Sequence, residues 1–306
     1  MFVKPFHYLR AQSVEEAVRL LSENSDAKLL AGGQSLMPLI NLGLAQVDAV
    51  IDIAPIIGLE GVTLETGDQP AGRSQAAAEL RIGALTRHRT LELDQTVRKS
   101  QPLLAEAVRH VGNPRVRNLG TLGGSLAHND PAAELPLVMQ VLDAECTISN
   151  GGGTRTVPAD EFFISYFTTA LHEDELLVSV RVPPLPDGWG WGFHEFALRT
   201  GDFAIVAAAA IARCSSDPGG QENGVIESVQ VGLAGVAERA IRCRAFEAAA
   251  RGVEVDKLED VAEVVEDDID PVDDPLVSAA YKRHLARVLT VRAVQDACRR
   301  AVSCEP

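Results

Sequence analysis

The sequence predicts an α+β protein built from two parts. Its 306 residues correspond to about two domains of roughly 100–200 residues each. Strand and helix patterns alternate in the first part, whereas in the last third strands come first and helices follow, the order typical of an α+β domain. A proline-rich stretch at residues 183–188 lies between the two patterns and is the best candidate for a linker.

The first 55 residues form a small unit with a strand, a helix and a strand pattern. Ser13 and Glu16 make a capping box, and the apolar residues behind them recur at helical spacing, which predicts a helix over 14–23. Short apolar strands are expected at 28–30 and 49–53. A glycine turn at residues 31–35 follows the first of them.

Residues 56–177 are expected to form a second unit of strands and helices. A helix is predicted over 102–110, stopped by Gly112, and another begins between Pro131 and Pro136, because a helix interior would not hold the second proline. The expected strands are 80–83, 144–149, 154–157 and 176–182, the middle two forming a hairpin around residues 150–151.

The C-terminal part is expected to contain strands over 203–213 and 228–234. The alanine run at 207–210 is equally compatible with a helix. The predicted helices are 242–251, 256–266 and 275–302, and the last has Asp274 as its cap and Pro275 at its first helical position.

The charge and hydropathy of the chain exclude some classes of function. Acidic residues outnumber basic ones 43 to 28, giving a net charge of −15, so a phosphate backbone would repel the protein and nucleic-acid binding is not expected. No apolar run reaches the roughly 18 residues of a membrane span. The first ten residues lack the apolar stretch of a signal peptide. We therefore expect a cytoplasmic protein.

The five cysteines are scattered along the chain and show no C-x-x-C spacing. This pattern argues against a disulfide framework, a structural zinc site and an iron–sulfur cluster held by this chain alone. We expect buried or idle thiols and no metal site. The cysteines are Cys146, Cys214, Cys243, Cys298 and Cys304.

Two glycine turns are the main functional signal. Residues 32–33 follow a predicted strand, and residues 123–124 precede a predicted helix. Glycine allows a ligand to approach the backbone closely, and successive N–H groups in such a turn can bind an anion. Ser35, Thr121 and Ser125 add hydroxyl groups. Two such turns could hold one pyrophosphate, although a glycine pair more often forms a plain turn.

Other nucleotide-binding and catalytic motifs do not occur. The chain has neither the G-x-G-x-x-G fingerprint nor a P-loop, so a standard Rossmann or P-loop protein is disfavoured. The H-E pairs at 172–173 and 194–195 lack the second histidine of a zinc peptidase, and no G-x-S-x-G elbow surrounds Ser35 or Ser125. Arg115 and Arg117 lie just before the second turn. We expect them either to face a ligand or a partner, or to lie in a loop exposed to solvent.

Four motifs in order resemble the FAD-binding medium subunit of molybdenum hydroxylases, the xanthine dehydrogenase and carbon monoxide dehydrogenase flavoprotein family. The resemblance covers almost the whole chain, from Pro5 to residues 281–286, which lie within the last predicted helix. The motifs are AGGQSL at 31–36, RNLGTLGGSLAH at 117–128, DPAAELP at 130–136 and GDFA at 201–204.

The resemblance implies a two-lobed FAD-binding domain of the vanillyl-alcohol oxidase (PCMH) type over 1–177, with lobes of about 1–55 and 56–177. A small α+β domain like the C-terminal domain of carbon monoxide dehydrogenase flavoprotein would cover 178–306. The implied function is electron transfer in a heterotrimer: FAD receives electrons from the [2Fe–2S] clusters of a small partner subunit, next to a large molybdopterin subunit. The electrons then pass to an external acceptor.

The resemblance also implies which residues bind FAD, and it implies no catalytic acid, base or nucleophile in this chain. The two turns would cradle the pyrophosphate. Glu134 would hydrogen-bond the ribityl region, and Leu177 and Phe203 would lie near the isoalloxazine ring. The turn residues are Ala31, Gly32, Gly33, Gln34 and Ser35 in the first turn, and Thr121, Leu122, Gly123, Gly124 and Ser125 in the second.

The chain departs from the family pattern near the expected cofactor. Ser125 stands where the family usually has asparagine, Glu134 where it has aspartate, and Glu195 where it often has lysine. Residues 41–44 also lack the usual basic pair. The lost positive charge could shift the flavin potential or the acceptor. Two alternatives therefore stay open: a self-sufficient FAD oxidase or dehydrogenase of the same fold, and an assembly subunit without flavin.

Overall fold

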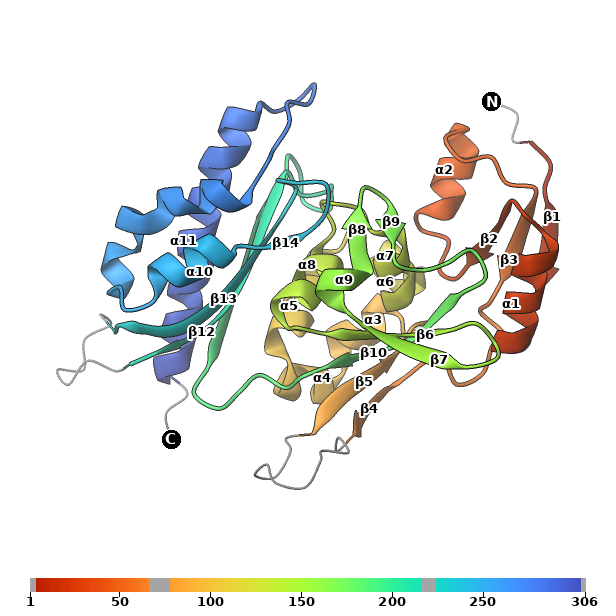
Figure 1. The fold of residues 1–306 in the computed structure, drawn as a ribbon, viewed down its shortest axis with the longest axis horizontal. Coiled ribbons are helices and arrows are strands. Elements are labelled where there is room, and N and C mark those ends of the chain that lie inside the picture. The colour runs from red at the N-terminus through yellow and green to blue at the C-terminus, as the bar shows by residue number, and fades with distance from the viewer. Residues whose placement is uncertain (1–3, 66–77, 216–223, 304–306) are drawn as a thin grey trace.

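The computed structural model describes residues 4–65, 78–215 and 224–303 and confirms the α+β class. The three larger sheets lie side by side, in the order of the chain from right to left in Figure 1, and a two-stranded hairpin lies beside the middle one. Helices cover one or both faces of each sheet. No helix in the described ranges is long and apolar enough to cross a membrane.

The first sheet is small and parallel, with the order β1-β3-β2. The predicted helix over 14–23 is confirmed with its cap, because the Ser13 hydroxyl accepts a hydrogen bond from the Glu16 N–H at 3.2 Å. The elements are β1 (His7–Arg10), α1 (Val14–Glu23), β2 (Ala27–Leu30), α2 (Leu36–Leu42) and β3 (Ala49–Asp52).

The middle sheet is antiparallel and has the order β4-β5-β10-β6-β7. Its β10 strand continues across residue 177, where the first domain was expected to end. The strands are β4 (Val62–Glu65), β5 (Glu79–Gly83), β6 (Glu145–Ser149), β7 (Thr154–Pro158) and β10 (Leu176–Val182), with the β8 (Phe163–Ser165) and β9 (Thr168–Thr169) hairpin beside them.

Seven short helices accompany the middle sheet. One of them, α8, is buried along its whole length and also packs on the third sheet, so it joins the two parts of the protein. The helices are α3 (His88–Leu93), α4 (Gln95–Ser100), α5 (Pro102–His110), α6 (Pro114–Leu119), α7 (Leu122–His128), α8 (Glu134–Val141) and α9 (Ala159–Phe162).

The third sheet is an antiparallel meander in the order β11-β12-β13-β14. The alanine run is a strand: it lies in β12, where the small side chains let the sheet pack closely against helices on both faces. The elements are β11 (Gly190–Phe196), β12 (Val206–Cys214), β13 (Ile226–Ala234), β14 (Ile241–Arg242), α10 (Arg244–Ala250), the 3-10 helix η1 (Val255–Asp268) and α11 (Ala279–Ser303).

The last helix begins later than expected. Asp274 accepts hydrogen bonds from the N–H groups of Leu276 and Val277, at 2.8 and 2.9 Å. It therefore closes a local turn, and α11 starts only at Ala279. A proline at residue 275 was compatible with a first helical turn, but it also suits this preceding turn.

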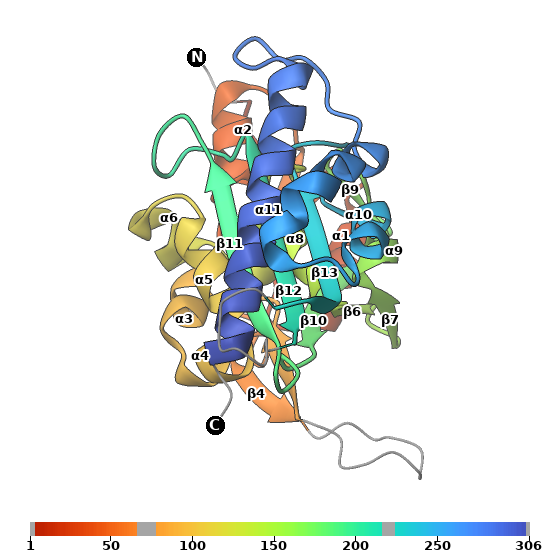
Figure 2. The same cartoon turned by 90° about the vertical axis from the view of Figure 1, so that its left-hand side faces the viewer.

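Helix α11 crosses β11 and β12 at very short distance (Figure 2). A Cβ atom on Gly190 would lie 1.9 Å from the Ala297 carbonyl oxygen, and one on Gly192 would lie 2.0 Å from that of Ala293. Both positions therefore require glycine. Between them, the Trp191 ring packs against the apolar core and lies under the Arg300 guanidinium, whose Cζ is 3.8 Å from the ring centroid.

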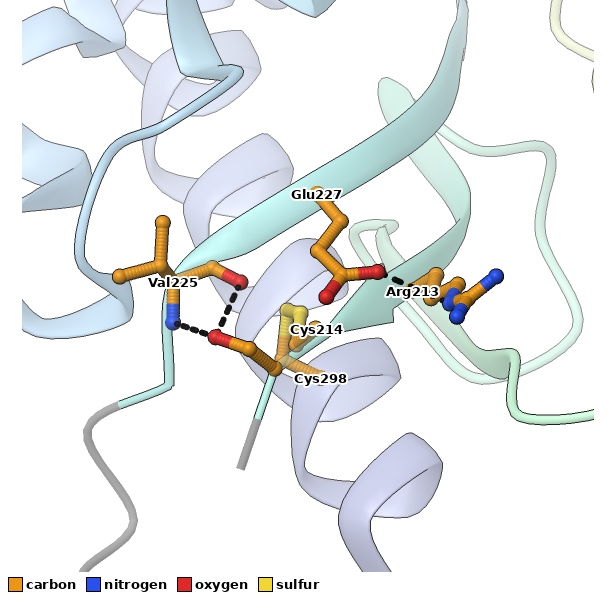
Figure 3. The surroundings of a disulfide bond; sticks show 6 residues. Arg213, Cys214, Val225, Glu227 and Cys298 are labelled. Atoms are coloured by element: carbon orange, nitrogen blue, oxygen red, sulfur yellow. Dashed lines mark hydrogen bonds and ion pairs between the residues drawn. A yellow bond between two sulfur atoms is a disulfide. The ribbon is translucent and has the colours of Figure 1, made fainter. Parts of the chain in front are cut away.

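One cysteine pair corrects the expectation of unlinked thiols. Cys214 at the end of β12 forms a disulfide with Cys298 on α11 (Figure 3). The two are 84 residues apart in the chain and meet only because α11 packs on β12. Cys146 and Cys243 are buried free thiols, as expected, and Cys304 lies outside the described residues. The described residues contain no cluster of three or more potential metal ligands.

Candidate functional site

The two glycine turns lie directly against each other, although about 90 residues separate them in the chain. A Cβ atom on Gly32 would lie 2.2 Å from the Leu119 carbonyl oxygen and 2.9 Å from the Gly120 Cα. The Ala31 Cβ is 3.9 Å from the position that a Cβ on Gly124 would take. The first turn, between β2 and α2, is therefore seated on the backbone of the second, between α6 and α7.

The first turn leaves its backbone donors available. In the described part of the chain, the N–H groups of residues 32–35 donate to no protein acceptor. Gly33 has a φ of +69°, a left-handed conformation that glycine adopts without strain. The Gln34 side chain folds back and donates to the Gly32 carbonyl at 3.1 Å. Four successive free N–H groups can bind an anion.

The second turn uses its backbone donors internally. The N–H groups of Leu122 and Gly123 donate to Thr86 and Ala84 at 2.9 and 2.8 Å, and that of Gly124 donates to the Thr121 hydroxyl at 3.1 Å. The Ser125 N–H donates to the Thr121 carbonyl at 3.1 Å. The second turn is thus a rigid floor. It offers a ligand the exposed Gly124 backbone and the hydroxyl of the half-buried Ser125.

A buried histidine supports this floor from below. The backbone N–H of His88 donates to the Gly120 carbonyl at 3.0 Å, and the imidazole ring of His88 lies 2.9 Å from the position that a Cβ on Gly120 would take. The side chain is 4% exposed, and neither ring nitrogen has a hydrogen-bond partner among the described residues. Burial lowers the pKa of His88 to about 4, and the charge of Arg117 adds to the effect. The ring is therefore neutral at pH 7.

Arg117 belongs to the scaffold and does not face a ligand or solvent. It is 8% exposed, its Nε lies 3.0 Å from Glu92 Oε2, and its Nη1 donates to the Val111 carbonyl at 3.1 Å. It braces the segment that leads into the second turn. Arg115, by contrast, is exposed.

The buried His88 predicts a loss of stability in acid. Because its folded pKa of about 4 lies below the ordinary 6.5, the unfolded chain takes up the proton first as pH falls. Its contribution is complete above pH 6.5 and is lost between pH 6.5 and 4, by at most about 3 kcal/mol. Chemical denaturation across this range should show a shallower pH slope for His88→Gln, and His172→Gln, at an exposed position, should match the wild type. Equal slopes for wild type and His88→Gln would contradict the assignment.

Glu134 is a buried carboxyl group at the start of α8. It is 7% exposed, and no other described residue donates a hydrogen bond to it. Burial raises its pKa to about 7, the negative charge of Glu195 adds to this, and the charge of His110 opposes it. Its own backbone N–H is the only donor to it among the described residues, so a ligand hydroxyl would offset part of the remaining desolvation cost.

The two residues predicted near the flavin ring lie in different settings. Leu177 in β10 is 3% exposed and packs in the apolar core next to the middle sheet. Phe203 is 67% exposed, on the loop between β11 and β12. This loop contacts the turn between α5 and α6, because a Cβ on Gly201 would lie 3.2 Å from the Gly112 carbonyl oxygen.

A charged cluster that no sequence motif predicted lies at the end of α5. His110 Nδ1 lies 3.2 Å from Glu195 Oε1, and His110 Nε2 lies 3.6 Å from Glu106 Oε1. These two carboxylates raise the pKa of His110 to about 9. In the sequence, Glu195 is part of the incomplete H-E pair at 194–195 and a departure from the family pattern, and His110 is the end of a predicted helix. Because the two residues lie far apart in the sequence, no local pattern could predict that they pair.

Comparisons with known proteins match the chain over nearly its full length. The family model described as the FAD binding domain in molybdopterin dehydrogenase matches residues 4–185, and the model of the CO dehydrogenase flavoprotein C-terminal domain matches residues 191–297. The chain is 37% identical to subunit alpha of the 6-hydroxypseudooxynicotine dehydrogenase complex of Paenarthrobacter nicotinovorans, covering 97% of this chain and 95% of that one. It is 34% identical to the carbon monoxide dehydrogenase medium chain of Hydrogenophaga pseudoflava, covering 95% and 96%.

Two solved structures share the fold over nearly the full chain. A carbon monoxide dehydrogenase structure from Hydrogenophaga pseudoflava superposes with a TM-score of 0.86 at 36% identity, covering 98% of this chain and 99% of that one. The quinoline 2-oxidoreductase of Pseudomonas putida 86 also gives 0.86, at 32% identity and the same coverage.

Proposed function

Because the chain belongs to the FAD-binding medium subunits of the molybdenum hydroxylases, the family of carbon monoxide and xanthine dehydrogenases, we propose that it is the electron-transfer subunit of such a complex. It would receive electrons from [2Fe–2S] clusters of a small partner subunit and deliver them to an external acceptor. A large partner subunit would hold the molybdopterin and oxidise the substrate.

The observation that carries this proposal is the contact between the two glycine turns. Gly32 rests on the Leu119 and Gly120 backbone, beside a row of free N–H groups. A pyrophosphate fits this arrangement, because backbone dipoles can hold the anion without lysine side chains. The net charge of −15 is therefore no obstacle to binding FAD.

The residues fit FAD along an extended path from the first turn to α8. We assign the pyrophosphate to the N–H groups of residues 32–35 in the first turn, and to the exposed Gly124 backbone and the Ser125 hydroxyl in the second. The Glu134 carboxyl, whose only donor among the described residues is its own backbone N–H, suits a ribityl hydroxyl, as acceptor when ionised and as donor when protonated. The isoalloxazine ring would lie toward Leu177 and Phe203. When bound, FAD supplies the exchange between single-electron and paired-electron transfer.

The electron source and the location are further parts of the proposal. No C-x-x-C spacing suitable for a cluster occurs in this chain, which supports a separate iron–sulfur subunit as the source. We propose a cytoplasmic location. The Cys214–Cys298 disulfide weighs against it, since cytoplasmic thiols are normally kept reduced.

Reconstitution tests the proposal directly. The full chain, purified alone and mixed with FAD, is expected to retain a visible flavin absorbance band after gel filtration. Co-expressed with small and large subunits from the same gene neighbourhood, it should elute with them, and substrate should bleach the flavin band. A chain that binds no FAD either alone or in the complex would overturn the cofactor assignment. A flavin that substrate does not reduce in the assembled complex would overturn the electron route.

A further inference from the structure

His110 occupies the seam between the two parts of the protein. It is the last residue of α5, and it pairs with Glu106 of its own helix and with Glu195 of β11. Helix α5 packs on both β11 and α8, the helix that begins with Glu134. The His110 imidazole therefore lies between the carboxylate of Glu106 on α5 and that of Glu195 on β11. Its helix also packs on α8, which begins with a third carboxyl group, that of Glu134.

Glu195 depends on this imidazole for its only partner among the described residues. Its Oε1 atom faces His110, whereas its Oε2 atom is buried and makes no hydrogen bond. Its side chain is 12% exposed. An ionised carboxylate in such a place is tolerated because the neighbouring cation compensates it, and removing one partner of a buried pair leaves an uncompensated charge.

We propose that His110 is a positioning residue of the FAD site, which as an imidazolium anchors the Glu195 carboxylate and thereby limits the negative charge that Glu134 experiences. The inference rests on the proposed function, because Glu134 is the residue assigned to the ribityl chain. Glu195 stands where the family often has a lysine. In this chain the positive charge next to that position therefore comes from His110.

The charged groups around the cluster allow this role. His110 faces Glu106 and Glu195, and Arg109 neutralises the far side of Glu106 at 2.9 Å. The charges of Glu195, His110 and Asp130 act on the pKa of Glu134, those of Glu195 and Asp130 raising it and that of His110 lowering it. The pKa of His110, raised to about 9, keeps the ring charged at neutral pH. Loss of its charge would leave Glu134 among carboxylates only.

A neighbouring histidine provides a matched control. His194 precedes Glu195 on β11 and has the same side-chain exposure as His110, 32%. Its Nε2 lies 3.1 Å from Asp296 on α11, on the opposite side of the strand. His194→Gln therefore removes an equally exposed histidine–carboxylate pair without touching the cluster.

The test is FAD affinity of the full-length apo chain, followed by flavin fluorescence from pH 6 to pH 10. Compared with the wild type, His110→Gln should bind FAD about tenfold more weakly at pH 7 to 8. This ratio should shrink toward one near pH 10, where the wild-type ring has lost its proton as well. His110→Lys should restore tight binding, and His194→Gln should behave as the wild type throughout.

The outcomes separate this inference from the proposed function. If wild type and His110→Gln bind FAD equally tightly at every pH, the function stands and the positioning role fails. A loss that is the same at all pH values and is not rescued by lysine would indicate mere packing and would also overturn the inference. Absence of FAD binding by the wild type would instead refute the proposed function. NMR titration of the ring in the apo chain provides a readout that does not need FAD, and a pKa for His110 at or below 6.5 would contradict the proposal.

Discussion

Replacing Gly32 with alanine is expected to abolish tight FAD binding. The added methyl carbon would lie 2.2 Å from the Leu119 carbonyl oxygen and 2.9 Å from the Gly120 Cα, so the two turns must move apart. Both contacts are backbone atoms, which cannot rotate away as a side chain can. A loss on the order of 100-fold in affinity, about 2.8 kcal/mol, is within the cost of such overpacking. Fluorescence titration of the apo chain with FAD measures it.

Gly153→Ala is the matched control for this change. Gly153 lies in the hairpin turn between β6 and β7, and a Cβ there would meet nothing within 4 Å. This variant should bind FAD as the wild type does. Circular dichroism should show that Gly32→Ala keeps its secondary structure, so that the loss reflects the site. Wild-type affinity in a folded Gly32→Ala chain would show that the contact between the turns is not needed for binding.

Opening the Cys214–Cys298 disulfide is expected to cost the protein a large part of its stability. The bond closes a loop of 84 residues that contains β13, α10, η1 and most of α11. In the chain-entropy treatment, a loop of this length is worth about 4–5 kcal/mol through the unfolded state. At about 2–4 °C per kcal/mol, dithiothreitol should lower the melting temperature by about 10 °C. Differential scanning calorimetry with and without the reductant measures the shift.

A double variant distinguishes this effect from a general response to reductant. Cys214→Ala with Cys298→Ala should melt near the temperature of the reduced wild type and should not respond to dithiothreitol. Mass spectrometry of a non-reduced digest should show the two peptides linked. If reductant leaves the melting temperature of the wild type unchanged, the bond contributes nothing to stability. The free thiols Cys146 and Cys243 are buried and stay the same in every sample.

Local signals predicted most of the elements. The capping box at Ser13 placed α1 correctly, and the turn at residues 150–151 placed the β6–β7 hairpin. These predictions succeeded because capping and turn chemistry act within a few residues. The start of α11 was wrong because Asp274 closes a turn of its own before the helix. The alanine run of β12 was ambiguous because only its two packed faces make it a strand.

Motifs in the linear sequence were enough to identify the family, the cofactor and the two glycine turns, because these rest on residue types at fixed spacings. How the two turns differ became visible only in the folded chain, where the first turn has free N–H groups among the described residues and the second uses its N–H groups within the protein. The folded chain also revealed the disulfide and the pairing of His110 with Glu195. Those features depend on distances between elements far apart in the chain. Burial then sets the charge of each group, and burial is a property of the packed molecule.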